Sequence, residues 1–546
     1  MTAYTAHLDT FARDNLPPPD QWPVMDLAKA GLKYPERLNC ATELLDNKVQ
    51  AGLGPKPVFY TPRETWTYAN LQDRANRIAH VLVDELGLKP GNRVLIRAAN
   101  NPMFVACWFA IAKAGGIVVA TMPLLRAKEL SVIIDKAEID FALCDERLSE
   151  EMEKTPALTS RLQRICYFNG SGEPGAGAEL ERLMSDKSPN FDTVQTAAED
   201  VVLIAFTSGT TGLPKGTMHF HRDVMIINDA YCTKMLRPGV TDIFIGSPPI
   251  AFTFGLGGLV TFPMHVGAAT VLLEKASPPV LAAAIDDFRA TICFTAPTAY
   301  RVMTDLSQDF ALTSLRKCIS AGETLPIPIH EDWKRATGIG IMDGMGATEM
   351  LHIFISFPEE MVRPGVTGMP VPGYEAMIVD DNMNEMPRGE VGKLAVRGPT
   401  GCRYLADDRQ KNYVRDGWNL TGDAFLQDED GFFRFAARAD DMIISSGYNI
   451  SGPEVEEALL SHDAVAECGV VAAPDAARGH IVKAYVVLRE GQSPSPELVK
   501  HMQDYVKNAI APYKYPRAIE FLPALPRTET GKVQRFRLRQ MAEGKE

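Results

Sequence analysis

The feature that most constrains this chain is an apolar run that breaks abruptly into small polar residues. Residues 201–206 read VVLIAF, which has the length and the β-branched content of a buried strand, and residues 207–216 follow as TSGTTGLPKG. Because glycine, serine and threonine leave backbone N–H groups and hydroxyls accessible, such a loop can surround phosphate oxygens, and Lys215 adds a cation. The spacing differs from GxxxxGK(S/T), so the phosphate loop of kinases and GTPases is excluded. We therefore predict a strand that ends in a phosphate-binding loop.

Strand and helix patterns alternate through the first two thirds of the chain. Residues 68–86 carry apolar side chains at helical spacing, and residues 93–97 and 116–120 read as strands on either side of an apolar helix. The alternation continues through further strand patterns at 271–273 and 292–294. This order predicts an α/β fold with mostly parallel sheets.

The pattern changes twice toward the C-terminus. After about residue 365 the chain has short strands and turns, and a charged break at 438–441 precedes a fresh α/β pattern. A chain of 546 residues is also too long for one core. We expect a large N-terminal domain at 1–437, made of two α/β subdomains and a small β-rich subdomain, then a hinge at 438–442. Residues 443–546 are expected to form a small, mobile α+β C-terminal lid domain.

Composition narrows the class of protein. A net charge of −13 argues against nucleic acid or an anionic membrane as a partner, so anions must be held by local loops. The nine cysteines include no CxxC pair, which is typical of reduced thiols and not of a disulfide frame or a zinc site. The N-terminal residues lack a signal-peptide pattern, and the apolar run at 103–114 is too short to span a membrane. We expect a cytoplasmic enzyme.

The loop TSGTTGLPKG resembles the phosphate loop of the adenylate-forming enzymes. These include acyl- and aryl-CoA synthetases, peptide-synthetase adenylation domains and firefly-type luciferases. Further motifs of this superfamily follow in family order: SAGETLP at 320–326, DGMGATE at 343–349, WNLTGD at 418–423 and PRTETGKVQR at 526–535. The resemblance covers roughly the whole chain and implies an ATP-dependent, AMP-forming enzyme.

The resemblance assigns a nucleotide site. It implies that Glu349 holds Mg²⁺, which prefers hard oxygen ligands, and that Thr348 contacts the α-phosphate. It places Asp343 near the adenine amino group, Met345 against the ring and Asp423 on the ribose hydroxyls. The whole set implied for ATP or AMP is Thr207, Ser208, Gly209, Thr210, Thr211, Lys215, Ala321, Gly322, Glu323, Asp343, Gly344, Met345, Asp423 and Arg438.

Residues after the hinge are implied to serve both steps of a two-step reaction. Lys532, on a glycine-bearing turn, would reach the carboxylate and the α-phosphate as a catalytic residue with Thr348 and Glu349. Asp440 would be the hinge residue. Ala437 and Ile444 depart from the family pattern, where glycine and lysine are frequent, and the second departure removes one polar contact. The residues implied to hold CoA are Ser446, Gly447, Tyr448 and Arg478.

The chain resembles benzoate-type and 2-aminobenzoate-type CoA ligases more closely than fatty-acid enzymes, through residues 251–257, 348–354 and 511–517. By analogy, aromatic and small side chains line a flat acyl pocket that accepts one ring. A mostly apolar pocket rejects a substrate with a single added polar group only about 10²-fold, so the choice between benzoate and 2-aminobenzoate stays open. We slightly prefer the substituted acid, because Thr253 is a polar residue of the implied pocket. The implied pocket residues are Thr253, Phe254, Gly346, His352 and Ile353.

The predicted function is therefore an aryl-CoA ligase that uses ATP, Mg²⁺ and CoA. It converts an aromatic acid to its thioester through an acyl-adenylate and releases AMP and pyrophosphate. The alternatives are a CoA ligase for another cyclic or medium-size acid, a luciferase-like oxygenase and a carrier-protein-loading enzyme. The last alternative function is that of a non-enzymatic nucleotide sensor. The sequence leaves open whether the chain is a monomer or a homodimer.

Overall fold

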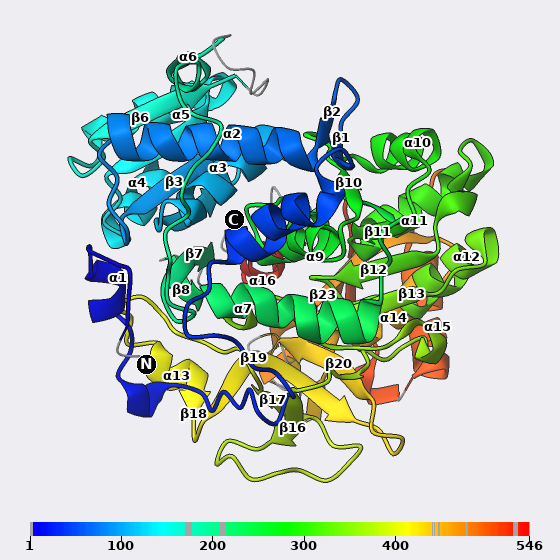
Figure 1. Cartoon of the computed structure of the whole chain (residues 1–546). Helices are drawn as coiled ribbons and strands as arrows, with labels where there is room; N and C mark the ends of the chain where they lie inside the picture. The colour runs from blue at the N-terminus through cyan, green and yellow to red at the C-terminus, as the bar shows by residue number, and fades with distance from the viewer. Residues whose placement is uncertain are drawn as a thin grey trace.

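The computed structural model describes residues 4–169, 177–207, 214–438, 441, 443–445, 448–475, 479–510, 512–527 and 533–544. Figure 1 shows two sheets covered by helices, a smaller sheet below them and a C-terminal domain beside α12 (Ile327–Thr337). This arrangement confirms the predicted α/β fold with a large N-terminal part and a small C-terminal domain. Among the helices of the described residues, none has the length and apolar character of a bilayer-spanning segment.

The first sheet has six strands in the order β6-β5-β3-β4-β7-β8. All neighbours are parallel except β7 and β8, which are antiparallel. The predicted strand at 201–206 is β7, which extends to Thr207. The strands are β3 (Arg93–Arg97), β4 (Ile117–Thr121), β5 (Phe141–Asp145), β6 (Arg164–Phe168), β7 (Val201–Thr207) and β8 (Lys215–Phe220), and the helices of this subdomain include α2 (Tyr68–His80), α3 (Pro102–Lys113), α4 (Ala127–Lys136) and α6 (Glu179–Met184).

The second sheet has nine strands in the order β15-β14-β13-β12-β11-β9-β10-β1-β2, parallel at its centre and antiparallel at both edges. The strand expected at 271–273 is β10 and ends at Val271, because the chain turns away into residues 272–277. The strands are β1 (Pro57–Tyr60), β2 (Thr65–Thr67), β9 (Ile243–Gly246), β10 (Ala269–Val271), β11 (Ile292–Thr295), β12 (Lys317–Ala321), β13 (Ile341–Gly346), β14 (Ile353–Ser356) and β15 (Met369–Pro370). The helices include α7 (His221–Ile227), α8 (Thr253–Leu256), α9 (Phe262–Val266), α10 (Pro278–Phe288) and α11 (Pro297–Asp305).

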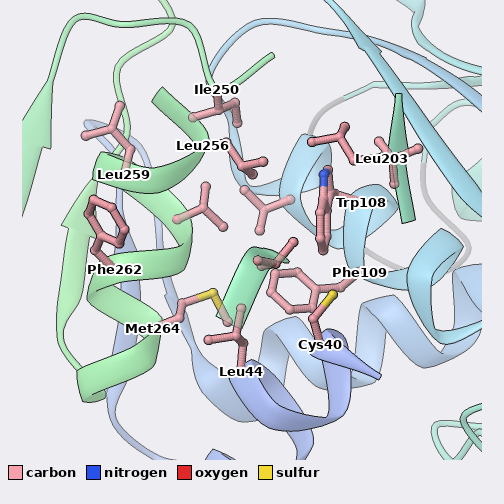
Figure 2. Packing of buried hydrophobic residues seen from close by; sticks show 14 of the residues in the cluster. Cys40, Leu44, Trp108, Phe109, Leu203, Ile250, Leu256, Leu259, Phe262 and Met264 are labelled. Atoms are coloured by element: carbon pink, nitrogen blue, oxygen red, sulfur yellow. The ribbon is translucent and has the colours of Figure 1, made fainter. Parts of the chain in front are cut away.

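One hydrophobic core joins these two sheets. Every residue of α3 is buried, as expected for a helix that is apolar on all sides. Figure 2 shows Trp108 and Phe109 of α3 with Leu203 of β7 on one side and Leu256 and Phe262 of the second subdomain on the other. The two α/β subdomains therefore share a continuous core and form a rigid base for residues at the ends of their strands.

The later part of the chain is richer in antiparallel strands. A five-stranded sheet contains β16 (Glu375–Val379), β17 (Gly392–Arg397), β18 (Val414–Arg415), β19 (Trp418–Gln427) and β20 (Phe433–Arg438). After it come β21 (Ile443–Ser445) and β22 (Tyr448–Ile450), then a separate three-stranded sheet of β23 (Val465–Asp475), β24 (Gly479–Leu488) and β25 (Ala518–Phe521). The C-terminal helices are α14 (Gly452–Leu460), α15 (Pro496–Ala509) and α16 (Arg535–Ala542).

Candidate nucleotide and acyl site

The predicted phosphate loop connects two antiparallel strands. β7 ends at Thr207, β8 begins at Lys215, and these two residues are register partners. Ser208, Gly209, Thr210 and Thr211 lie outside the described residues. The strand pair therefore fixes where the loop leaves and rejoins the sheet, and it fixes the position of the predicted phosphate-binding lysine.

Lys215 and Glu349 lie close together although they are far apart in the sequence. Glu349 belongs to a short 3₁₀ turn, Thr348–Met350, and its Oε1 lies 3.8 Å from Lys215 Nζ. The hydroxyl of Tyr404 donates a hydrogen bond to Glu349 Oε1 and lies 3.0 Å from Lys215 Nζ. Glu349 is 7% exposed and Tyr404 is 1% exposed. Sequence reasoning found the two charged residues and missed Tyr404, because nothing in its local sequence marks it.

A buried histidine supports the same turn from β8. His219 Nε2 lies 2.8 Å from the carbonyl oxygen of Thr348 and donates a hydrogen bond to it. Burial lowers the pKa of His219 to about 4, so the ring is neutral at physiological pH. Strand β8 thus carries both Lys215 and the histidine that is hydrogen-bonded to the turn with Thr348 and Glu349.

The predicted adenine residues gather at the carboxyl ends of neighbouring parallel strands. In the register of β12 and β13, Ser320 pairs with Asp343 and Ala321 pairs with Gly344. Gly322 and Glu323 follow directly after β12, and Met345 lies on β13. Ligands of open α/β sheets bind at such strand ends. Burial raises the pKa of the Asp343 carboxyl to about 8, which favours its protonated form at neutral pH.

The two predicted ribose contacts face each other across a strand pair. Asp423 of β19 and Arg438 of β20 are register partners in the β-rich sheet. Asp423 is 2% exposed. The backbone therefore brings these positions together.

Phe254, one of the predicted acyl residues, packs against the buried imidazole of another, His352. Thr253 and Phe254 begin α8, and Gly346 of β13 is the register partner of Ile353 of β14. His352 is 2% exposed. Its ring centroid lies 5.8 Å from that of Phe254, 5.4 Å from that of Tyr231 and 4.5 Å from that of Phe262. Tyr231 and Phe262 were not predicted, because they lie on helices that only the tertiary fold brings to this place.

The environment of His352 determines its charge. Burial lowers the pKa of His352 to about 3, against a smaller opposing effect of the Phe254 backbone, so the imidazole is neutral. Neither ring nitrogen has a hydrogen bond of normal geometry among the described residues. A Cβ atom on Gly257 would lie 2.3 Å from His352 Cδ2, so this glycine makes room for the ring. The ring can offer one donor and one acceptor to a ligand.

The predicted hinge and lid residues lie mostly outside the described residues. This applies to Asp440, Ser446, Gly447, Arg478 and Lys532, and the structure describes only the backbone of Tyr448, at the start of β22. Next to these gaps, Arg527 Nη2 and Arg301 Nη2 contact the carboxylate of Glu467 at 2.9 and 3.1 Å. Because Arg301 belongs to α11, its ion pair with Glu467 connects the C-terminal domain to the large domain.

Comparisons with known proteins agree with this geometry. The model of the family "AMP-binding enzyme" matches residues 47–404, and that of the "AMP-binding enzyme C-terminal domain" matches residues 454–532. Benzoate–CoA ligase of Thauera aromatica is 34% identical over 517 residues, which cover 93% of this chain and 97% of that protein. The mitochondrial acyl-coenzyme A synthetase ACSM3 of Homo sapiens is 31% identical, over 93% of this chain and 90% of its own. The crystal structure of the anthranilate CoA ligase AuaEII in complex with anthranoyl-AMP matches with a TM-score of 0.89 and 33% identity, over 94% of this chain and 99% of that chain.

These matches define the class of protein. The chain belongs to the AMP-binding enzyme family, and the predicted resemblance to benzoate-type and 2-aminobenzoate-type CoA ligases is confirmed. The predicted enzyme class, an AMP-forming acid–thiol ligase that uses ATP and CoA, is confirmed as well. This class excludes the non-enzymatic nucleotide sensor.

Proposed function

We propose that this ligase converts a single-ring aromatic carboxylate, of the benzoate or 2-aminobenzoate class, to its CoA thioester through an acyl-adenylate. The observation that carries the chemistry is the convergence of Lys215 and Glu349, 3.8 Å apart, beside the strand ends that hold the predicted adenine residues. A cation and a buried carboxylate at this place suit an ATP phosphate chain and its metal ion.

In the first half-reaction, a carboxylate oxygen of the acid attacks the α-phosphorus of ATP. The new P–O bond forms as the bond to the β-phosphate breaks, and pyrophosphate leaves with the electron pair. Lys215 and Lys532 are proposed to hold the negative charge that builds on the phosphate oxygens. Thr348 is proposed to donate a hydrogen bond to the α-phosphate, and the hydrogen bond from His219 to its carbonyl oxygen fixes its turn.

In the second half-reaction, the CoA thiol gives its proton to solvent and the thiolate attacks the carbonyl carbon. The C–S bond forms as the C–O bond to the phosphate breaks, and AMP leaves with the electron pair. We propose that the lid domain turns about Asp440 between the steps, so that Lys532 serves the first step and residues 446–448 line the thiol path in the second. Such a rotation would let one small domain present each segment to the same site in turn.

Glu349 is the proposed metal ligand. Its carboxylate is buried and offers hard oxygen atoms, and the Lys215 ammonium stays 3.8 Å away from it, so the position suits a metal cation. When bound with ATP, Mg²⁺ would neutralise charge on the phosphate oxygens. Glu349 and the nucleotide would hold it.

The preference for an aromatic acid is proposed from the surroundings of His352. A neutral imidazole packed among Phe254, Phe262 and Tyr231 offers flat apolar faces and one polar group. This combination suits a planar ring with a small polar substituent, so we propose 2-aminobenzoate as the better of the two substrates. Thr253, which is 8% exposed, is the second polar group proposed to meet the substituent.

A panel of aryl and alkyl acids tests this function by AMP release with CoA. We expect the highest kcat/KM with benzoate or 2-aminobenzoate, and Thr253→Val is expected to lower the ratio between 2-aminobenzoate and benzoate. The similarity to a protein named acyl-coenzyme A synthetase favours a second candidate, a CoA ligase for a carboxylic acid that is not aromatic. Highest activity with an alkyl acid of the panel would replace the first proposal by the second.

A further inference from the structure

Tyr404 lies on a segment that pairs with the strand carrying Lys215. Tyr404 forms an isolated β-bridge with Thr217 of β8, and the Leu405 N–H donates to the Gly216 carbonyl at 2.8 Å. On the other side of Tyr404, Arg403 accepts a hydrogen bond at 2.8 Å from the Met218 N–H. These backbone contacts therefore fix the tyrosine beside the predicted phosphate-binding lysine.

The ring of Tyr404 is equally well fixed. Its centroid lies 5.7 Å from that of Tyr413 in an edge-to-face contact, and Lys215 Nζ lies 4.9 Å from the Tyr404 centroid. With 1% of its surface exposed, the side chain has no room to rotate away.

The hydroxyl group sits between two opposite charges. It donates to Glu349 Oε1 and accepts from Lys215 Nζ at 3.0 Å, while the two charged groups themselves are 3.8 Å apart. A tyrosine hydroxyl is both a donor and an acceptor, so it satisfies the carboxylate and the ammonium together. Without it, lysine and glutamate would be free to close into a direct, partly buried ion pair, in which attraction is stronger than in water. In that pair neither group would be available to a ligand.

We propose that Tyr404 is a positioning residue that keeps Lys215 and Glu349 apart, so that Glu349 stays available to a divalent cation and Lys215 to phosphate. This inference rests on the proposed metal-binding role of Glu349. We assign Tyr404 no contact with the carboxylate oxygen of the acid or with the α-phosphorus of ATP.

Binding of Mn²⁺, used as the probe cation with the enzyme in molar excess over ATP so that no unbound ATP competes for the metal, tests the inference. The free Mn²⁺ signal in electron paramagnetic resonance gives the dissociation constant directly. Because Tyr404→Phe removes one charge-assisted hydrogen bond and releases a competing ammonium, we expect the Mn²⁺ constant to rise about tenfold. The KM for the aromatic acid should stay within about twofold, because the acyl residues are untouched.

Tyr300→Phe is the matched control. Tyr300 is also fully buried, and its hydroxyl donates to the carbonyl oxygens of Cys293 and Ile319 at 3.0 and 3.1 Å. This variant should lose comparable stability in thermal unfolding and leave the Mn²⁺ constant unchanged. An equal rise in both variants would overturn the inference, because it would show a general loss of packing.

Glu349→Gln separates this inference from the proposed function. If Glu349→Gln abolishes Mn²⁺ binding but Tyr404→Phe leaves it within about twofold of the wild type, the positioning role of Tyr404 is wrong and the function stands. If Glu349→Gln leaves Mn²⁺ binding unchanged, the proposed metal site is wrong, and the role of Tyr404 fails with it.

Discussion

Adding a single methyl group at Gly257 tests whether His352 helps to form the acyl site. A Cβ atom at this position would lie 2.3 Å from His352 Cδ2 and 2.6 Å from Nε2. Since ordinary contacts between carbon atoms need about 3.5 Å, the imidazole must move by about 1.2 Å. Its neighbours leave little space for that movement, because Phe254, Phe262 and Tyr231 pack around the ring. Gly257→Ala is therefore expected to displace the imidazole itself.

The expected cost can be worked from the same contact. Alanine is favoured over glycine by about 1 kcal/mol within a helix, and Gly257 begins the helical segment Gly257–Thr261. Overpacking a core costs about 1–3 kcal/mol, so the net free energy of unfolding should fall slightly. A displacement of this size at a substrate contact can lower the rate up to about 10²-fold. We expect kcat/KM for the aromatic acid to fall about 10- to 100-fold, with the KM for ATP unchanged.

Acid-dependent pyrophosphate exchange measures the effect, with Gly239→Ala as the control. A Cβ atom on Gly239 would meet only Asp242 Oδ2, at 3.8 Å, so this variant should behave as the wild type. If Gly257→Ala retains full exchange activity with every aromatic acid, His352 does not shape the acyl site and our reasoning is refuted.

Three further predictions concern the core, the adenine strand and the hinge. Arg403→Met should lower the free energy of unfolding in denaturant by about 3–5 kcal/mol, because it leaves Asp223 buried without its ion-pair partner. The control Arg335→Met breaks an exposed ion pair with Asp332 and should lower the free energy of unfolding by less than about 1 kcal/mol. Equal losses would contradict the burial argument. The pKa of Asp343 is about 8 in the folded protein, against 3.8 as the ordinary value, so ionisation of this carboxyl opposes folding. The free energy of unfolding of the wild type should therefore fall as the pH rises from about 4 to about 8. This fall should exceed that of Asp343→Asn by at least about 1 kcal/mol. Unfolding curves with the same pH slope in both proteins would show that the shift is absent. Asp440→Pro should reduce thioester formation more than pyrophosphate exchange, and equal retention of both would count against a rotating lid.

The sequence predicted those parts of the site that local patterns specify. The apolar run before the phosphate loop is β7, and the two motifs that begin at Ser320 and Asp343 lie on the neighbouring strands β12 and β13. Each of these motifs lies at or near the carboxyl end of a strand. Such motifs are continuous in the chain, so they are visible without knowledge of the tertiary fold.

The supports of the site were not predictable in the same way. Tyr404 meets Lys215 across 189 residues of sequence, and His219 meets Thr348 across 129 residues. Neither belongs to a periodic pattern or a spaced motif, and a tyrosine or histidine of this kind is ordinarily a core residue. The space for His352 likewise depends on Gly257, whose role follows only from the close approach of its helical segment to the residue that precedes β14. Long-range contacts of single side chains are therefore the part that required the structure.

The central claim is that one site performs two half-reactions with different residues of a lid that rotates. Lys532→Ala tests it most directly, with pyrophosphate exchange and thioester formation from preformed acyl-adenylate measured on the same preparation. Lys500→Ala is the control, because Lys500 lies in the same domain, is exposed and forms a surface ion pair with Asp504 four residues along α15. We predict that Lys532→Ala lowers pyrophosphate exchange by on the order of 10²–10³ and leaves thioester formation from the adenylate nearly unchanged. An equal loss of both half-reactions would contradict the account.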